Sequence, residues 1–423
     1  MKVLWFTNTP SMAAEFLHVT SNGGGWIESL EKQFSKKNEI QLGIAFPYGT
    51  QEAKSFVIGT NSYFSFPVIE DHGKFRKFIN RWKHSIEPES VVYQYLDIVK
   101  VFQPDLIHIF GTESAYGLMV PYLKIPVIIQ IQGNLTVVSK KWFSGVSFIQ
   151  ILRFSYFNNV IRALGIWHYY FKFAKCALRE QKIFDNGKYF IGRTDWDRRI
   201  AKVLSDDSLY FHCDELLRDI FYETRWTDQA NSKLVFYSTL AHHTYKGLEA
   251  ILETAAILKN KINTEFEWQI AGINGKEEII RIIEKSYKLR FIDHNINFKG
   301  NITAEELASG LLQASIYIHP SHIENSPNSV CEAMLIGMPV IATYAGGIPS
   351  MILDKKEGIL VQDGDQYAMA GAILELIEDR NYAVELGKNA RVRAMNRHNP
   401  EKVLNKILEI YSTVVLKDTS SLL

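Results

Sequence analysis

Two glutamates, Glu324 and Glu332, have types and a spacing that could do chemistry together, with seven residues between them. Glu324 lies in a loop, whereas Glu332 lies inside the following helix beside Cys331 and Ala333. Eight helical positions span about 12 Å, because an α-helix rises about 1.5 Å per residue. Two acids that far apart neither share a proton nor flank one scissile bond. The spacing suits two ends of an extended ligand, with phosphate at the positive helix terminus between them.

The elements that must position these acids form a predicted strand, loop, helix and second strand. Residues 312–319 are short and apolar enough to form a buried parallel strand. Ser326 is the expected N-cap of the helix, and Pro327 pre-sets its first turn. Gly337 ends the helix as a left-handed cap, and a buried strand follows at residues 340–342. The helix therefore begins beside the carboxyl end of a strand. The alternative, a loop acid and a solvated helix acid, is disfavoured by the apolar neighbours of Glu332.

The sequence between these two strands resembles the E-x7-E signature of the retaining glycosyltransferases of family 4. The wider pattern, an acid, a loop, Pro, four residues, Glu-Ala-Met, Gly-x-Pro and Val-Ile-Ala, matches over about thirty residues. The resemblance implies an α/β protein with the GT-B fold, in which two facing Rossmann-like domains with parallel sheets enclose an interdomain cleft. It also implies an enzyme that transfers a sugar from a nucleotide-diphosphate sugar to a saccharide or lipid-linked saccharide, in the biosynthesis of a cell-surface polysaccharide.

Length and composition agree with two domains. A chain of 423 residues exceeds the size at which one core keeps growing. We expect an N-terminal domain at residues 1–205 and a C-terminal donor domain at 206–398. A helix at 399–423 is expected to pack back on the first domain. A formal net charge of +1 argues against a nucleic-acid binder, and three scattered cysteines fit neither a disulfide framework nor a zinc site.

Within the second half, Lys246 precedes a predicted helix, where a cation can hold phosphate. By resemblance, Lys246 holds the donor diphosphate, Glu332 the ribose hydroxyls, and Glu324 with the backbone of residues 325–328 the sugar hydroxyls. Family members place an Arg where this chain has Thr239. The residues expected to bind donor are Glu332, Asn325, Ser326, Pro327, Asn328, Ser329, Thr239, Gly24 and Gly25.

In the first half, a predicted strand ends at Gln132, where the family usually has a histidine near the reaction centre. Glutamine forms hydrogen bonds but does not titrate, so a general acid or base role is not carried over. Glu324, Lys246 and Gln132 are therefore the expected catalytic residues. His108, Glu113 and Asn134, at or after strand ends, are the expected residues on the acceptor side, although a lone strand histidine such as His108 is more often a core residue.

Two further motifs could bind a ligand or a metal, but each also has a purely structural explanation. Three glycines at residues 23–25 precede a helix and form either a flexible turn or a ligand loop, and the resemblance favours the loop. Asp195 and Asp197 have the spacing of a metal pair, but they open a helix, where acids are favoured in any case. We therefore expect no metal and no cofactor other than the nucleotide-sugar substrate.

Residues 140–179 combine seven Lys and Arg with many aromatic residues and contain no Asp or Glu. This composition suits the interface of an anionic membrane, although many of the aromatic residues could belong to the core. No run of eighteen apolar residues is present. We expect a cytoplasmic protein that associates with the inner face of the cytoplasmic membrane.

Two other functions remain open at this point. One is a non-catalytic GT-B-like scaffold that binds a nucleotide or lipid, which the missing Arg and His would favour. The other is an epimerase of the same fold. The presence of Glu324, Glu332 and Lys246 together favours the transferase.

Overall fold

Short apolar runs, each followed by a polar loop, build two separate sheets in this protein. The computed structural model describes residues 1–19, 25–37, 39–49, 53–68, 73–228 and 233–420. Contacts divide the chain into two units. The first comprises Met1–Thr136, Lys172–Leu216 and His398–Leu423, and the second comprises Val137–Phe171 and Leu217–Arg397.

The first unit contains an eight-stranded sheet with the strand order β3-β4-β2-β1-β5-β6-β7-β8. Its strands are β1 (Lys2–Phe6), β2 (Gln41–Pro47), β3 (Lys54–Ile58), β4 (Asn61–Phe66), β5 (Leu106–Phe110), β6 (Val127–Gln130), β7 (Tyr189–Gly192) and β8 (Leu209–His212). The central strands are almost entirely buried, as expected of a parallel sheet covered on both faces.

Two features of this sheet differ from the sequence-based expectation of a parallel sheet within residues 1–205. Strand β3 pairs antiparallel with β4 through a tight connection at residues 59 and 60, in a stretch whose mixed composition gave no signal. Strand β8 pairs in parallel with β7, so the sheet continues past the expected domain boundary at residue 205. The half-exposed pattern of β8 explains why it resembles a connecting segment.

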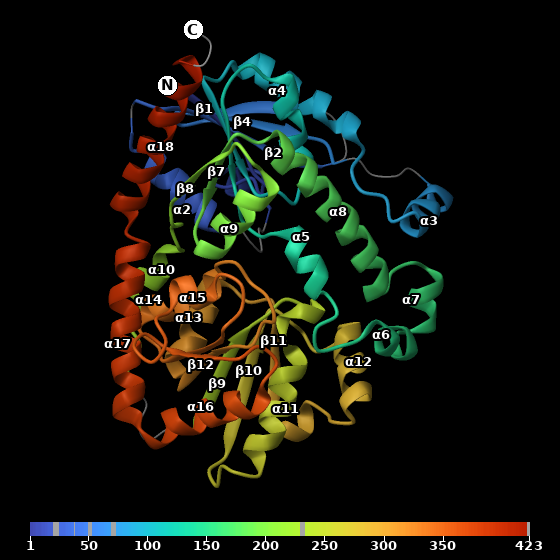
Figure 1. Ribbon diagram of the computed structural model, residues 1–423, viewed down its shortest axis with the longest axis vertical. Coiled ribbons are helices and arrows are strands. Elements are labelled where there is room, and N and C mark those ends of the chain that lie inside the picture. Colours follow the sequence, from blue (N-terminus) through green and yellow to red (C-terminus); the bar gives the residue numbers. More distant parts are fainter. Residues whose placement is uncertain (20–24, 38, 50–52, 69–72, 229–232, 421–423) are drawn as a thin grey trace. The chain divides into compact units, whose positions relative to one another are not determined.

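The helices of the first unit surround its sheet and include the C-terminal helix (Figure 1). Tyr411 of α18 is fully buried in the core formed with Trp5 and Phe34, and the Trp5 indole donates to its hydroxyl over 3.0 Å. The helices wholly within this unit are α1 (Ala13–Phe16), α2 (Gly25–Phe34), α3 (Lys74–Trp82), η1 (Glu89–Val91), α4 (Val92–Phe102), η2 (Ala115–Tyr122), α9 (Asp195–Leu204) and α18 (Pro400–Ser420).

The second unit contains a six-stranded parallel sheet with the order β11-β10-β9-β12-β13-β14. Its strands are β9 (Leu234–Thr239), β10 (Phe266–Ala271), β11 (Ile296–Gly300), β12 (Ile316–His319), β13 (Val340–Thr343) and β14 (Ile359–Val361). The helices that alternate with them are α10 (Asp219–Glu223), η4 (Thr244–Lys246), α11 (Leu248–Lys259), α12 (Glu278–Tyr287), η5 (Ile292–His294), α13 (Ala304–Gln313), α14 (Asn328–Ile336), α15 (Ile348–Met351), α16 (Gln366–Glu378) and α17 (Arg380–Arg397).

The segment Val137–Phe171 packs with the second unit, although it precedes residue 205. Its buried side chains Val146, Ile151 and Ile166 join the apolar core around β9 and α11. The chain order alone suggested the first domain, but burial of these side chains decides the packing. The helices of this stretch are α5 (Leu135–Val138), η3 (Ser139–Lys141), α6 (Phe148–Phe154), α7 (Phe157–Ile161) and α8 (Ile166–Asn186); α5 begins in the first unit, and α8 continues into it.

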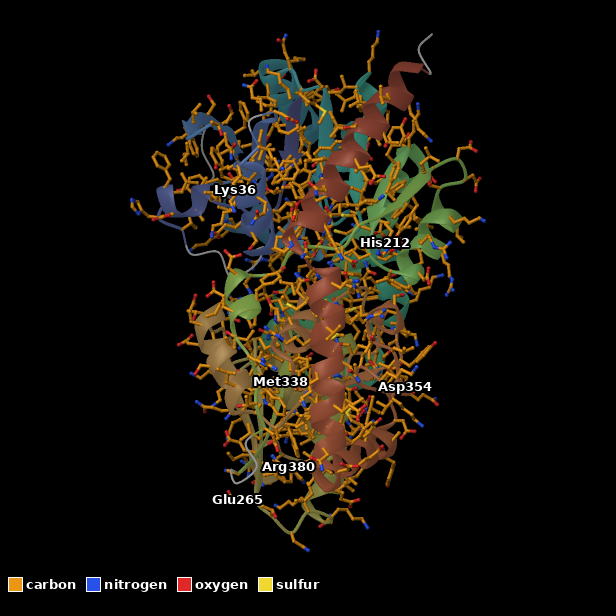
Figure 2. The ribbon with its side chains drawn as sticks, turned by 90° about the vertical axis from the view of Figure 1, so that its left-hand side faces the viewer. Lys36, His212, Glu265, Met338, Asp354 and Arg380 are labelled. Carbon is orange, nitrogen blue, oxygen red and sulfur yellow. The ribbon has the colours of Figure 1, made fainter. Side chains whose placement is uncertain are left out.

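The strand, helix and strand around the two glutamates form as predicted, with two shifts. Strand β12 begins at Ile316 and not at residue 312, because residues 312 and 313 end α13. Helix α14 begins at Asn328 with Pro327 in the N-cap position, so Ser326 does not cap it. Gly337 ends the helix with φ +89°, which confirms the left-handed cap. Helix α17 packs on α14. Figure 2 shows α17 running along the second unit, with Met338 beside the helix and Arg380 in its first turn. None of the helices in the described ranges has the length and hydropathy to cross a membrane.

Candidate active site

A lysine–glutamate pair lies at the carboxyl ends of β9 and β12 in the second unit. Lys246 ends η4, just before α11, and its ammonium group donates to the carboxylate of Glu324 in the loop before α14. Their side chains are 18% and 15% exposed. His319, the last residue of β12, lies with Nε2 3.9 Å from the same carboxylate oxygen. The structure therefore brings two of the predicted catalytic residues together.

Electrostatics fix the charge states around Glu324. Burial by itself raises the pKa of Glu324, but Lys246, His319 and His243 outweigh it and leave the pKa below its usual value. Burial lowers the pKa of His319 to about 4 and that of His243 to about 4. At neutral pH the Glu324 carboxylate is thus ionised and is flanked by two neutral imidazoles. His243 therefore adds no positive charge beside Lys246 at neutral pH.

Two glycines permit the close approach of the loops. Gly247 has φ +75°, and a Cβ atom there would overlap the carbonyl of Pro320. Gly346 has φ +55°, and a Cβ atom there would overlap the carbonyl of Glu324, which also accepts from the Gly347 backbone over 2.8 Å. Any larger residue would push the Lys246 loop or the Glu324 backbone out of place.

A second charged cluster holds the same loop. His322 Nε2 lies 2.5 Å from Glu249 Oε1, and its Nδ1 lies 2.5 Å from Asp363 Oδ1. Burial opposes the charge on His322, but the two carboxylates dominate and raise its pKa to about 9. The imidazolium therefore fastens the Glu324 loop to the first turn of α11 and to the turn before α16.

The segment that precedes α6 supports the Lys246 loop from another side. Thr244 Oγ1 donates to the Trp142 carbonyl, and the Trp142 ring lies 5.6 Å from the rings of His243 and of Tyr245. Lys141 Nζ lies 3.7 Å from Asp363 Oδ2. Residues 141–145 thus contact both the Lys246 loop and the His322 cluster.

Glu332, on α14, is engaged by an arginine that the sequence analysis did not identify. Arg218 Nε and Nη2 donate to Glu332 Oε1 and Oε2, each over 2.8 Å. Burial raises the pKa of Glu332, and Arg218 opposes that shift. The guanidinium also lies over the ring of Phe221, 4.8 Å from its centroid. Arg218 lies in a stretch without a recognisable motif, and no local signal could have paired it with a residue 114 positions away.

The other predicted donor residues are spread over three places. Asn325 and Ser326 are buried before α14, whereas Pro327, Asn328 and Ser329 are partly exposed at its first turn. Thr239 ends β9 and faces the hydroxyl of Tyr317, as does Ser329. Gly25 is the first residue of α2 in the first unit, and Gly24 lies outside the described residues.

In the first unit, Gln132 belongs to a buried network. Glu215 accepts from Gln132 Nε2 over 2.5 Å, from Gln130 Nε2 over 3.0 Å, and from the Arg193 guanidinium. A second guanidinium nitrogen of Arg193 donates to the Gln132 carbonyl over 3.0 Å. Arg193 and Glu215 are 5% and 2% exposed. The amide of Gln132 is thereby oriented by a carboxylate that sequence reasoning missed.

The three residues predicted on the acceptor side are buried to different degrees. His108 is fully buried, bonds the Tyr411 hydroxyl over 2.7 Å, and has a pKa lowered to about 3 by burial. Its ring therefore joins β5 to α18. Asn134 is fully buried before α5. Glu113 folds back over the glycine at the end of β5, and burial raises its pKa.

Asp195 and Asp197 lie in the first turn of α9, as expected of acids that open a helix. Thr194 and Asp197 form a capping box at the start of α9. The Asp197 carboxylate also accepts from the Arg193 backbone over 2.9 Å and from the Tyr210 hydroxyl over 2.5 Å. These bonds stabilise the helix start. That no metal takes part in the function stays a prediction.

Comparison with known proteins finds a family model that matches most of the second unit. Residues 225–393 match the family model described as glycosyl transferases group 1. The structure as a whole resembles solved glycosyltransferases, and the predicted GT-B class of two parallel-sheet α/β domains is confirmed.

Two solved structures illustrate this likeness. Sucrose-phosphate synthase from Thermosynechococcus elongatus has a TM-score of 0.71 at 15% identity, over 99% of this chain and 100% of that one. Anabaena HepE in complex with UDP-glucose has a TM-score of 0.67 at 13% identity, over 98% of this chain and 100% of that one. At such identities the likeness shows the fold alone.

Curated relatives match over part of their length. The amylovoran biosynthesis glycosyltransferase AmsK of Erwinia amylovora is 30% identical over 173 residues, 39% of this chain and 42% of that protein. The putative colanic acid biosynthesis glycosyltransferase WcaL of Salmonella typhimurium is 26% identical over 176 residues, 40% of this chain and 42% of that protein. The chain thus matches less than half the length of these relatives.

Proposed function

We propose that this chain is a retaining glycosyltransferase of family 4. It transfers a sugar from a nucleotide-diphosphate sugar to a saccharide or lipid-linked saccharide acceptor in the biosynthesis of a cell-surface polysaccharide. The names of AmsK and WcaL support a role in polysaccharide biosynthesis, and the complex of HepE with UDP-glucose supports a nucleotide-sugar donor.

The observation that carries the proposal is the pairing of Lys246 with Glu324 beside the first turn of α14. A nucleotide sugar has a diphosphate that needs a cation and sugar hydroxyls that need acceptors. Lys246 supplies the cation, the first backbone N–H groups of α14 add partial positive charge, and Glu324 accepts from sugar hydroxyls. When the glycosidic bond breaks, the leaving diphosphate gains charge, so these fixed groups stabilise the transition state more than the ground state.

We assign Glu332 to the nucleoside end of the donor. The Glu332 carboxylate would accept hydrogen bonds from the ribose hydroxyls. Arg218 donates to both oxygens of this carboxylate and so holds the carboxylate in position. Thr239, which replaces the usual arginine, can give a hydrogen bond but no charge. Lys246 is therefore the principal cation for the diphosphate in this proposal. Gln132 would orient donor or acceptor by hydrogen bonds, and no metal is required.

A lipid-linked acceptor never leaves the bilayer, so the proposal includes a cytoplasmic location with peripheral contact to an anionic membrane through residues 140–179. Short aromatic and basic helices are typical of such contacts.

The proposal is tested with purified protein and a panel of UDP-, GDP-, ADP- and dTDP-sugars. Thermal shift selects the nucleotide, and sugar release or transfer then measures turnover. Glu324→Gln should lower turnover by about 10²- to 10³-fold, because the sugar hydroxyls lose a charged acceptor. Glu378→Gln, at an exposed position at the end of α16, is the matched control and should turn over normally. The anomeric configuration of the product, read by NMR, tests retention.

A non-catalytic scaffold predicts a different result. It would bind a nucleotide in the thermal shift without turnover in any donor and acceptor combination. Normal turnover of Glu324→Gln would remove the carboxylate from the reaction.

A further inference from the structure

Helices α6 and α7 of the second unit expose large apolar side chains. Ile149 is 75% exposed, Leu152 42%, Phe157 76% and Ile161 47%. Apolar side chains exposed singly are common on protein surfaces, whereas several in one short stretch indicate a contact site. We call these four residues, with Arg153 and Arg162, the α6–α7 surface.

Core packing accounts for only one side of α6. Ile151 is fully buried in the apolar core of the second unit, and Phe154 packs against the same core. Ile149, Leu152 and Arg153 are exposed at positions i, i+3 and i+4, which form one stripe of a helix. The helix is therefore apolar on the face that packs and on the face that does not.

Helix α7 buries no side chain. Polar groups hold it instead: the Tyr156 backbone and Asn159 Nδ2 donate to Glu278 Oε1 over 2.8 and 3.1 Å. The Arg281 guanidinium lies 4.3 Å from the centre of the Tyr156 ring. Figure 1 shows α6 beside α12, which carries Glu278 and Arg281, with α7 next to α6. Five residues do not form a stable helix alone, and these contacts keep the exposed Phe157 in place.

All charged residues of the segment 140–171 are positive. Residues 140–171 contain Lys140, Lys141, Arg153 and Arg162, all exposed, and no Asp or Glu. Lys141 pairs with Asp363, so the docking surface depends on Arg153 and Arg162. Such a surface is complementary to a layer of anionic headgroups, with apolar side chains reaching the acyl boundary and cations remaining at the phosphates.

We propose that the α6–α7 surface docks the protein on an anionic lipid bilayer. Phe157, Ile149 and Leu152 enter the interface, and Arg153 and Arg162 contact lipid phosphates. Docking of this kind is peripheral, because helices this short cannot span a bilayer.

This proposal sharpens the membrane contact given above and holds whether or not the chain transfers sugar. The proposed docking surface does not include Lys175 and Arg179 of α8. Lys175 Nζ donates to the Lys83 carbonyl over 2.5 Å. Arg179 is 5% exposed and bonds Glu87 and the Glu113 carbonyl. Both cations already have partners inside the first unit, so the docking face ends before them.

The test is sedimentation of the full chain with vesicles of phosphatidylcholine, with and without phosphatidylglycerol. The protein should sediment with the anionic vesicles and dissociate as salt is raised. Ile149→Ser with Phe157→Ser should weaken binding about tenfold or more, because two large apolar side chains are lost. Arg153→Gln and Arg162→Gln should each weaken it about fivefold.

Tyr367→Ser is the matched control, since Tyr367 is 78% exposed on α16 of the same unit. It should bind vesicles as the unchanged protein does. Every variant should show the same thermal shift with the nucleoside diphosphate, which separates docking from donor binding and reports correct folding. Failure of the unchanged protein to sediment, or equal binding by the double variant, would overturn the proposal. So would a dimer in analytical ultracentrifugation that the double variant abolishes, because the surface would then bind a second copy.

Discussion

At the carboxyl end of the first sheet, the carboxylate of Glu215 accepts hydrogen bonds from Gln130, Gln132 and Arg193 and is almost fully buried. At the corresponding end of the second sheet, Glu324 pairs with Lys246, and both side chains keep part of their surface accessible. Both sites place an acid and a cation beyond parallel strands. The two sites differ in how many of the hydrogen bonds that the carboxylate can accept come from the protein itself.

This difference separates charges that hold a fold together from charges that a ligand can use. A buried carboxylate that three protein side chains engage, as Glu215 is, has little capacity left for a substrate. Loss of its cation leaves the carboxylate without compensation. A pair with one strong contact can exchange that contact for a diphosphate and a sugar. Gln132 is thus held in place by Glu215 and Arg193. Its amide does not titrate and transfers no proton.

The largest expected effect is on the buried network. Arg193→Met should lower the free energy of unfolding by about 3–5 kcal/mol. Burial already raises the pKa of Glu215 against the effect of Arg193, so without its main cation Glu215 must either hold an unpaired charge in the interior or take up a proton on folding. Urea denaturation at neutral pH measures the change. Arg193→Met with Glu215→Gln is the control and should recover most of the loss. If the single variant unfolds at the same urea concentration as the unchanged protein, Glu215 is not held as described.

The His322 cluster should give a stability that depends on alkaline pH. The pKa of His322 is raised to about 9 in the folded protein, against about 6.5 in an unfolded chain. Its contribution is therefore complete below pH 6.5 and is lost as the pH rises to about 9, a difference on the order of 3 kcal/mol. Unfolding measured at several pH values across this window, for the unchanged protein and for His322→Gln, gives the contribution as a difference.

His319 and His243 provide an internal contrast to His322. Their pKa values are lowered to about 4, so the stability they contribute is present above pH 6.5 and is lost as the pH falls toward 4. They do not contribute in the alkaline window. Equal slopes for His322→Gln and the unchanged protein above pH 6.5 would contradict the assignment of His322 as a cation.

Lys246→Met should separate binding from stability. Loss of a charge-assisted contact to phosphate is expected to weaken nucleoside diphosphate binding about 10- to 100-fold. Unfolding should change by only about 1 kcal/mol, because Glu324 remains partly accessible to water. Isothermal titration and urea denaturation measure the two quantities. A large loss of stability would place Lys246 with Arg193 as a structural cation.

The smallest effect is expected for Arg218→Lys, which replaces a two-pronged contact with a single one. Glu332 should be less well positioned, and the nucleoside diphosphate should bind about 5- to 10-fold more weakly. Inorganic pyrophosphate should bind as before, since it has no ribose. Equal weakening for both ligands would place Arg218 at the phosphates instead.

Local signals in the sequence account for much of this architecture. Thr303 followed three residues later by Glu306 is the sequence signature of a capping box, and the structure contains this box at the start of α13. The break at Pro320, the glycine at 337 and the apolar strands on either side predict the unit that carries both glutamates. These elements are specified by residues within a few positions of one another, so they can be read without knowledge of the rest of the chain.

The rest depends on partners far apart in sequence. Arg218 meets Glu332 across 114 positions, and His322 meets Glu249 across 73. Val146 and Ile151 join the second core although the first sheet is not yet complete at that point of the chain. Neither charge pairing of this range nor the choice between two cores leaves a local pattern.

The chain passes between its two units four times, and this has a consequence for exchanging parts between related proteins. A single junction near residue 216 would separate the second sheet from Val146, Ile151 and Ile166, and the first sheet from the helix that carries Tyr411. A functional hybrid therefore has to exchange residues 137–171 and 217–397 together. Recombination at one point should yield two cores that each combine side chains from both parents, and these should pack less well than the parental cores.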